Sequence, residues 1–123
     1  MIIIVSIVMG IALALALNVY IPPSLSSYVA IIILAALDTV FGAYRSTLEK
    51  KFEPSIFITG LFGNALLAAI LTFIGKKLDV DIHLAAVIVF GSRLFHNFAY
   101  VRRYFLGLYM TKKRLKSTDT EEK

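Results

Sequence analysis

The chain alternates long apolar segments with short polar ones, and this pattern predicts four helices. They are expected at about residues 2–21, 28–44, 56–74 and 82–103. At ~1.5 Å per residue, about twenty helical residues cover the ~30 Å hydrocarbon layer of a bilayer. We therefore expect an all-α, integral membrane bundle of four transmembrane helices over residues 1–110, followed by a frayed basic and polar tail over residues 111–123.

Turn and capping residues bound these segments. Pro22-Pro23 should stop the first helix, because proline lacks an amide donor and clashes with the preceding turn. Pro54 suits the first turn of the third helix. Three further boundaries are predicted: an N-cap for the second helix at Ser26 or Ser27, a left-handed cap at Gly75 and an N-cap for the fourth helix at Asp81.

The first segment resembles a signal peptide in part, since "ALALALN" offers small residues near its end. No positive residue follows the amino terminus, however, and the apolar run is long for a signal peptide. We expect this segment to be retained.

The overall composition agrees with a membrane protein. Apolar residues make up 59% of the chain and charged residues 17%, against about 25% charged in soluble domains. There is no cysteine, so disulfides and cysteine metal sites are excluded.

The basic residues are distributed unevenly and predict the orientation. Seven of the thirteen Lys and Arg residues lie from Arg102 onward and three lie in residues 45–55, whereas only Lys76 and Lys77 lie in the connection at 75–81. Positively charged short loops stay in the cytoplasm. We therefore expect a multi-pass protein of the bacterial plasma membrane with both termini cytoplasmic.

The basic end also suggests what the chain contacts. An anionic inner leaflet or a membrane-protein partner would meet Arg102, Arg103, Lys112, Lys113 and Arg114, and the chain could also form a homo-oligomer. Nucleic acid is not expected as a partner, because the tail has no folded module or aromatic platform.

Polar residues inside the predicted spans form the candidate site. Counted from the cytoplasmic ends, Asp38, Asn64 and Arg93 lie at similar depth. A lone charge in the bilayer costs at least ~2.5 kcal/mol, so Asp38 and Arg93 are expected to pair. His96 and Asn97 follow Arg93 on the same helical face and complete a predicted polar cluster. The pair could serve helix register alone, or it could handle a substrate, an ion or a proton.

Small residues recur on the same helices and predict close packing. The predicted faces hold Ala35, Asp38, Thr39 and Gly42; Gly60, Asn64, Ala68 and Thr72; and Ala85, Val89, Ser92 and His96. The expected packing positions are Gly42, Gly60, Ala68 and Gly91. The first segment repeats Gly10, Ala14 and Asn18 without any charge, so it is expected to be peripheral.

No catalytic motif is present. The chain contains no GxSxG, HExxH, Walker loop or GxGxxG sequence. We expect no enzyme activity, no catalytic residue, no cofactor and no metal, and we expect His96 to form a hydrogen bond rather than bind a metal.

Three stretches carry a resemblance: "LAALDTVFGAYR" at 34–45, "FITGLFGNALLAAIL" at 57–71 and "LAAVIVFGSRLFHN" at 84–97. In order and spacing they resemble the bacterial small basic protein family. The resemblance implies a short integral plasma-membrane protein of unassigned function, often encoded beside cell-division and envelope genes.

Two classes of function follow as hypotheses. The first is a non-enzymatic scaffold or accessory subunit of envelope or cell-division machinery. The second is an oligomeric transport module for a small solute, an ion or a proton that uses Asp38 and Arg93. A weaker third is a lipid-handling protein that uses Arg93 and His96 from the cytoplasmic side.

The predicted orientation can be tested by cysteine labelling in intact cells. An impermeant thiol reagent should label a cysteine placed at Ser24 and should label one placed at Lys116 only after the cells are opened. Labelling of position 116 from outside would contradict the orientation.

Overall fold

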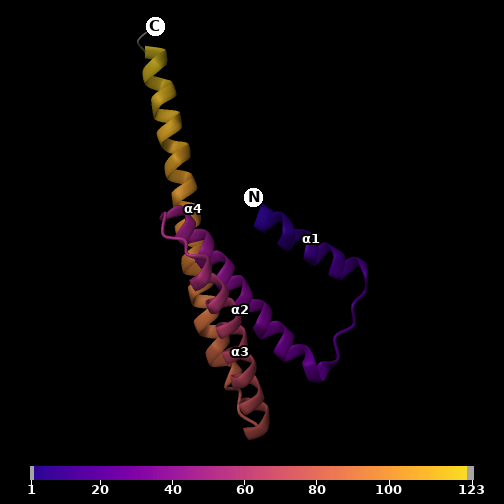
Figure 1. The fold of residues 1–123 in the computed structure, drawn as a ribbon. Helices are drawn as coiled ribbons and strands as arrows, with labels where there is room; N and C mark the ends of the chain where they lie inside the picture. Colours follow the sequence, from indigo (N-terminus) through magenta and orange to yellow (C-terminus); the bar gives the residue numbers. More distant parts are fainter. Residues whose placement is uncertain (1, 122–123) are drawn as a thin grey trace.

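The computed structural model describes residues 2–121, and over that range its regular secondary structure is all helical, with no strand. The four helices are α1 (Ile2–Ala16), α2 (Pro23–Leu48), α3 (Pro54–Leu78) and α4 (His83–Glu121) (Figure 1). By length and composition, α2, α3 and α4 are each long and apolar enough to cross a membrane. The prediction of four helices is confirmed, whereas only three of them meet this criterion.

The first helix is shorter than predicted. It has 15 residues, which span about 22 Å and fall short of the ~30 Å hydrocarbon layer. The chain leaves the helix at Leu17, and Asn18 takes a left-handed conformation with φ of 46°. Asparagine tolerates this conformation better than most residues, so the helix ends before Pro22-Pro23 is reached.

The same helix lies apart from the others. Within residues 2–121, α1 makes no contact with α2, α3 or α4, and an extended stretch separates it from α2 (Figure 1). This position is consistent with a peripheral first segment, and the side chains of α1 that the structure describes are exposed.

Other helix boundaries also differ from the predicted ones. Helix α2 begins at Pro23, at the first helical position that suits proline, and not at Ser26 or Ser27. Helix α3 begins at Pro54 as predicted but continues through Gly75, and the left-handed cap is Asp79 with φ of 53°.

The last helix is longer than expected. It begins at His83, two residues after Asp81, and runs to Glu121 without interruption. No proline follows Asp81 to break it, so the described part of the basic tail is helical and not frayed. Residues 122–123 of the predicted tail lie outside the described residues. Figure 1 shows α4 extending well past α2 and α3.

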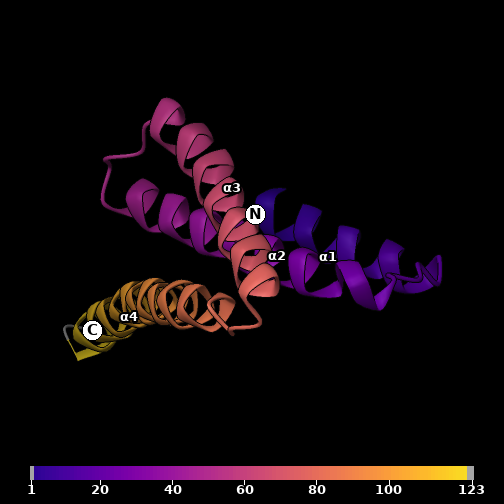
Figure 2. The same ribbon diagram turned by 90° about the horizontal axis from the view of Figure 1, so that it is seen from below.

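Helix α2 is the centre of the bundle. It packs against both α3 and α4, which contact each other much less. Seen from below, α2 and α3 diverge toward the loop that joins them (Figure 2). The buried core is small and consists of Ile31, Ala35, Ala68, Ala86 and Phe90, with Leu34 and Leu71 packed against it.

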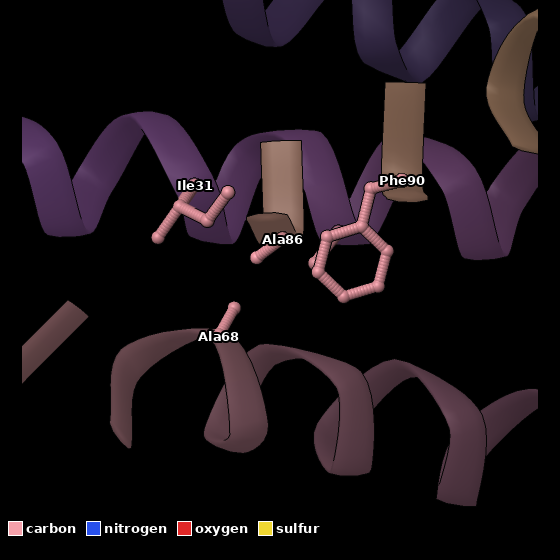
Figure 3. Packing of buried hydrophobic residues seen from close by; sticks show 5 residues of the cluster. Ile31, Ala68, Ala86 and Phe90 are labelled. Carbon is pink, nitrogen blue, oxygen red and sulfur yellow. The ribbon is translucent and has the colours of Figure 1, made fainter. Parts of the chain in front are cut away.

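The core shows how the helices approach one another. Ala68 on α3 and Ala86 on α4 point toward the α2 face that carries Ile31 (Figure 3). Alanine side chains let helix backbones come close, and the ring of Phe90 fills the remaining space beside them. The predicted small-residue faces of α2 and α3 are therefore at the interface.

The packing face predicted for α4 is wrong. Ala85, Val89, Ser92 and His96 are exposed. The side that packs on α2 carries Ala86, Phe90, Asn97 and Val101, a rotation of about 100° or one residue. Gly91 is not a packing position either, because a Cβ there would meet nothing within 4 Å. Phe90 explains the difference, since burying a large aromatic side chain outweighs matching small residues.

Lys76 joins the end of α3 to the start of α2. Its ammonium group donates a hydrogen bond to the carbonyl of Ser24 over 2.7 Å. The same nitrogen lies 4.6 Å from the centre of the Tyr28 ring, a cation–π contact. These contacts hold the end of α3 against the start of α2, so the two helices are antiparallel.

Gly75 allows the chain to fold back after α3. A Cβ at this position would lie 2.7 Å from the carbonyl oxygen of Val80, closer than real contacts allow. The amide of Val80 also donates to the carbonyl of Gly75 over 3.0 Å. The glycine is thus needed for a close backbone approach and not for a left-handed conformation.

This contact leads to a stability prediction. Gly75→Ala should lower the free energy of unfolding by about 1 to 3 kcal/mol, because the added methyl must displace backbone. Gly63→Ala in the same helix is the control, since a Cβ there meets nothing within 4 Å, and it should stabilise by about 0.5 to 1 kcal/mol through helix propensity. Thermal unfolding in detergent, followed by circular dichroism, measures both. Equal effects of the two substitutions would contradict the prediction.

Candidate functional site

The structure brings Asp38 and Arg93 together as an ion pair between α2 and α4. The Arg93 Nη2 atom lies 3.3 Å from Oδ2 of Asp38. The two side chains are buried very unequally: that of Asp38 is 0% exposed and that of Arg93 is 54% exposed. Within the described residues neither carboxylate oxygen of Asp38 accepts a hydrogen bond. Arg93 therefore compensates the charge of Asp38 without satisfying its hydrogen-bonding capacity.

Asn64 joins α3 to α2 directly beside this pair. Its amide nitrogen donates to the hydroxyl of Thr39 over 3.3 Å, and that hydroxyl donates to the carbonyl of Ala35 over 3.0 Å. Gly60 leaves room for the contact, since a Cβ there would lie 3.8 Å from the Thr39 methyl group. Asp38, Asn64 and Arg93 thus lie in one layer of the bundle.

Asn97, about one turn after Arg93, and Arg45, about two turns after Asp38, form a second polar contact. The guanidinium of Arg45 donates to the side-chain oxygen of Asn97 over 3.4 Å and to that of Glu49 over 3.0 Å. It also lies 4.6 Å from the centre of the Tyr100 ring. Gly42 faces the Asn97 amide, at 3.5 Å from an ideal Cβ. One arginine therefore links α2 to two residues of α4.

Arg45 is the residue that the sequence analysis missed, because it was counted only as a loop charge. A usable signal was present in Glu49, four residues later on the same helical face. Its partners on α4 could not be read from the sequence, since they depend on how the two helices are rotated.

His96 and the basic residues of the tail lie outside these contacts. His96 is exposed on α4 and bonds to none of the other cluster members within residues 2–121. Arg102, Arg103, Lys112, Lys113 and Arg114 are all exposed along α4. No group of three His, Asp, Glu or Cys side chains in the described residues could hold a metal ion.

Two cavities flank the ion pair. The α2–α3 cavity, of about 260 Å³, reaches from the loop after α2 to the polar layer. Its polar lining residues are Asp38, Thr39, Ser46, Lys51, Glu53, Asn64 and Arg93. It therefore presents both charges and hydrogen-bonding groups to whatever occupies it.

The α2–α4 cavity lies on the other side of Arg93. It has a volume of about 450 Å³. Its lining consists of Gly42, Arg45, Ser46, Ser92, Arg93, His96 and Asn97. Arg93, together with Gly42 and Ser46, lines both cavities and so separates them.

These features define a class: a small all-helical protein whose three long apolar helices hold a buried carboxylate against an arginine. Comparison with known proteins narrows this class to a family. Residues 21–106 match the model of a family described as proteins of unknown function (DUF1290). The chain belongs to this family, and the matched range covers α2, α3 and the bundle part of α4.

Related proteins align with most of the chain. The small basic protein of Bacillus subtilis (strain 168) is 40% identical and aligns over 92% of this chain and 93% of its own length. Uncharacterized proteins of Mycobacterium bovis and Mycobacterium tuberculosis (strain H37Rv) are each 38% identical over 85% of this chain and 88% of theirs. No solved structure matches the chain. The resemblance to the small basic protein family is thus confirmed.

The unequal burial of the ion pair predicts unequal effects of substitution. Arg93→Gln should destabilise by about 3 to 5 kcal/mol, because it leaves the fully buried Asp38 without a counter-charge. Asp38→Asn should cost less, since Arg93 can be solvated in either cavity. The double variant should recover most of the stability that Arg93→Gln loses. Thermal unfolding of the three variants in detergent measures these differences.

A double-mutant cycle gives the deciding comparison. A double variant no more stable than Arg93→Gln alone would refute direct pairing, and equal losses in the two single variants would refute the unequal burial. Arg103→Gln, an exposed arginine ten residues further along α4, is the charge-matched control and should change stability little.

Proposed function

We propose that this chain is a multi-pass protein of the bacterial plasma membrane that serves as a non-enzymatic scaffold or accessory subunit. The observation that supports this is the small extent of its internal packing. Only α2 is covered on two sides, and the described chain buries few side chains outside one small core. Most of its apolar surface is thus left for lipid or for other proteins.

The exposed side chains favour a membrane setting. Large apolar residues are exposed on every helix, among them Ile56, Phe62, Leu66, Ile88 and Phe95. Exposure of apolar surface to water costs about 25 cal/mol per Å², and contiguous patches of this kind mark lipid or protein contacts. In a bilayer the same residues meet acyl chains or partner helices at no such cost.

Helix α1 favours an accessory role. It is apolar and makes no contact with the rest of the described chain. An apolar helix without an internal partner is suited to pack against a helix of another membrane protein. The cytoplasmic loop and the basic end of α4 would then face the anionic inner leaflet or an acidic partner. We place it in envelope or cell-division machinery, the setting that the resemblance described in the sequence analysis implies.

The first experiment is purification of a tagged copy from its native membrane in mild detergent, with crosslinking and mass spectrometry. We expect another envelope or division protein in stoichiometric amount, with crosslinks to α1 or to the exposed face of α3. A variant with residues 2–16 replaced by a polyleucine helix should lose crosslinks to α1 and keep the bundle folded, because α1 does not contact it. Recovery of self-crosslinked oligomers alone would contradict the scaffold.

A second function, transport, is favoured by one observation. Asp38 is fully buried beside the α2–α3 cavity, and its two oxygens accept no hydrogen bond from the described residues. A proton or a cation could exchange with Arg93 at this carboxylate. A bundle with so few helices encloses little polar volume by itself, so transport would require an oligomer. A liposome flux assay tests it: flux that Asp38→Asn leaves unchanged would exclude Asp38 as the carrier.

A further inference from the structure

The α2–α4 cavity presents hydrogen-bond donors and no acid. Six of the seven lining residues have side chains with N–H or O–H groups: Arg45, Ser46, Ser92, Arg93, His96 and Asn97. The seventh residue, Gly42, has no side chain. No aspartate or glutamate contributes to the lining. The neighbouring α2–α3 cavity differs, because Asp38 and Glu53 line it together with Lys51 and Arg93.

The carboxylates that pair with the two arginines lie outside this lining. Asp38 is fully buried behind Arg93 and faces the α2–α3 side. Glu49 bonds to Nε of Arg45, away from the cavity lining. A guanidinium has five N–H donors on three nitrogens, and the contact of Arg93 with Asp38 uses only Nη2. Each arginine thus keeps donors for a further acceptor.

The cavity is open to the outside of the bundle. Ser92 and His96 are exposed on α4, and the Arg93 side chain is half exposed between them. Exposed apolar residues, Val89 and Phe95, lie on α4 beside this rim. A ligand with a polar anionic group and an apolar part would find both surfaces next to each other.

We infer that the α2–α4 cavity binds a phosphate group, supplied either by an anionic lipid headgroup or by free phosphate. Planar guanidinium groups bind phosphate oxygens through paired hydrogen bonds. Hydroxyl and amide donors at Ser46, Ser92 and Asn97 supply the additional neutral contacts. Basic pockets between membrane helices on the cytoplasmic side are suited to lipid headgroups. The inference that the phosphate group belongs to a lipid rests on the proposed membrane location, whereas phosphate binding itself does not.

The test uses the full chain purified in detergent. Native mass spectrometry would measure retention of dioleoylphosphatidylglycerol, with dioleoylglycerol as the matched lipid that lacks phosphate. Isothermal titration with inorganic phosphate would measure the free ion. We expect retention of the phospholipid and not of dioleoylglycerol.

Two variants and one control locate the binding. Ser92→Leu fills the cavity from an exposed position without changing charge. The double variant Asp38→Asn with Arg93→Gln removes one guanidinium while leaving no unpaired carboxylate. Each should weaken binding roughly tenfold or more, the first by occupying the cavity and the second by removing one charge-assisted contact. Lys77→Gln removes an exposed positive charge at the end of α3, outside the lining, and should leave binding unchanged.

Each outcome decides the inference. Phospholipid retention that falls in the two variants and persists in Lys77→Gln supports a headgroup site. The same dependence for inorganic phosphate alone supports a site for the free ion. Equal retention of dioleoylglycerol, equal loss in all variants including the control, or no binding of either phosphate source would overturn it. Alkaline carbonate extraction of the native membrane distinguishes failure of this inference from failure of the proposed membrane location. A chain that stays in the membrane yet binds no phosphate contradicts only phosphate binding in the α2–α4 cavity.

Discussion

The bundle depends on one constraint, the burial of a carboxylate at Asp38. An ion removed from water needs a counter-charge, and a buried charge left without one is strongly destabilising. Arg93 supplies the counter-charge from α4, at 3.3 Å. A rotation of α4 by one residue would turn Arg93 away from α2, so the pair and the burial of Phe90 specify the same orientation of that helix.

The remaining contacts follow from that arrangement. With α4 placed on one side of α2, α3 occupies the other, held by small residues and by the bond from Asn64 to Thr39. Residues 21–106, the range matched by the family, contain every one of these contacts. Helix α1 and the end of α4 project from the bundle and have no partner within the described chain. Their surfaces are therefore available to contact other molecules.

Arg93 also couples the two cavities. Arg93 lines both of them, and its guanidinium pairs with the buried carboxylate. Arg93 can bond to a group in either cavity through its remaining N–H donors while Nη2 pairs with Asp38. The polar layer can thus hold the helices in register and still respond to what occupies the cavities, so a structural role and a binding role for the pair do not exclude each other.

The sequence by itself determined the features that depend on length, period and charge. Apolar runs predicted the helices, Pro54 predicted the start of α3, and the depth of Asp38, Asn64 and Arg93 followed from a rise of about 1.5 Å per residue. Tertiary structure decided which face of α4 is buried, because periodicity shows several possible faces, and the fit of Phe90 against α2 together with the pairing of Arg93 with Asp38 selects one. It also decided the role of Gly75 and the partners of Arg45. Each of these depends on contacts that form only when the chain folds, and no local pattern of residues specifies those contacts.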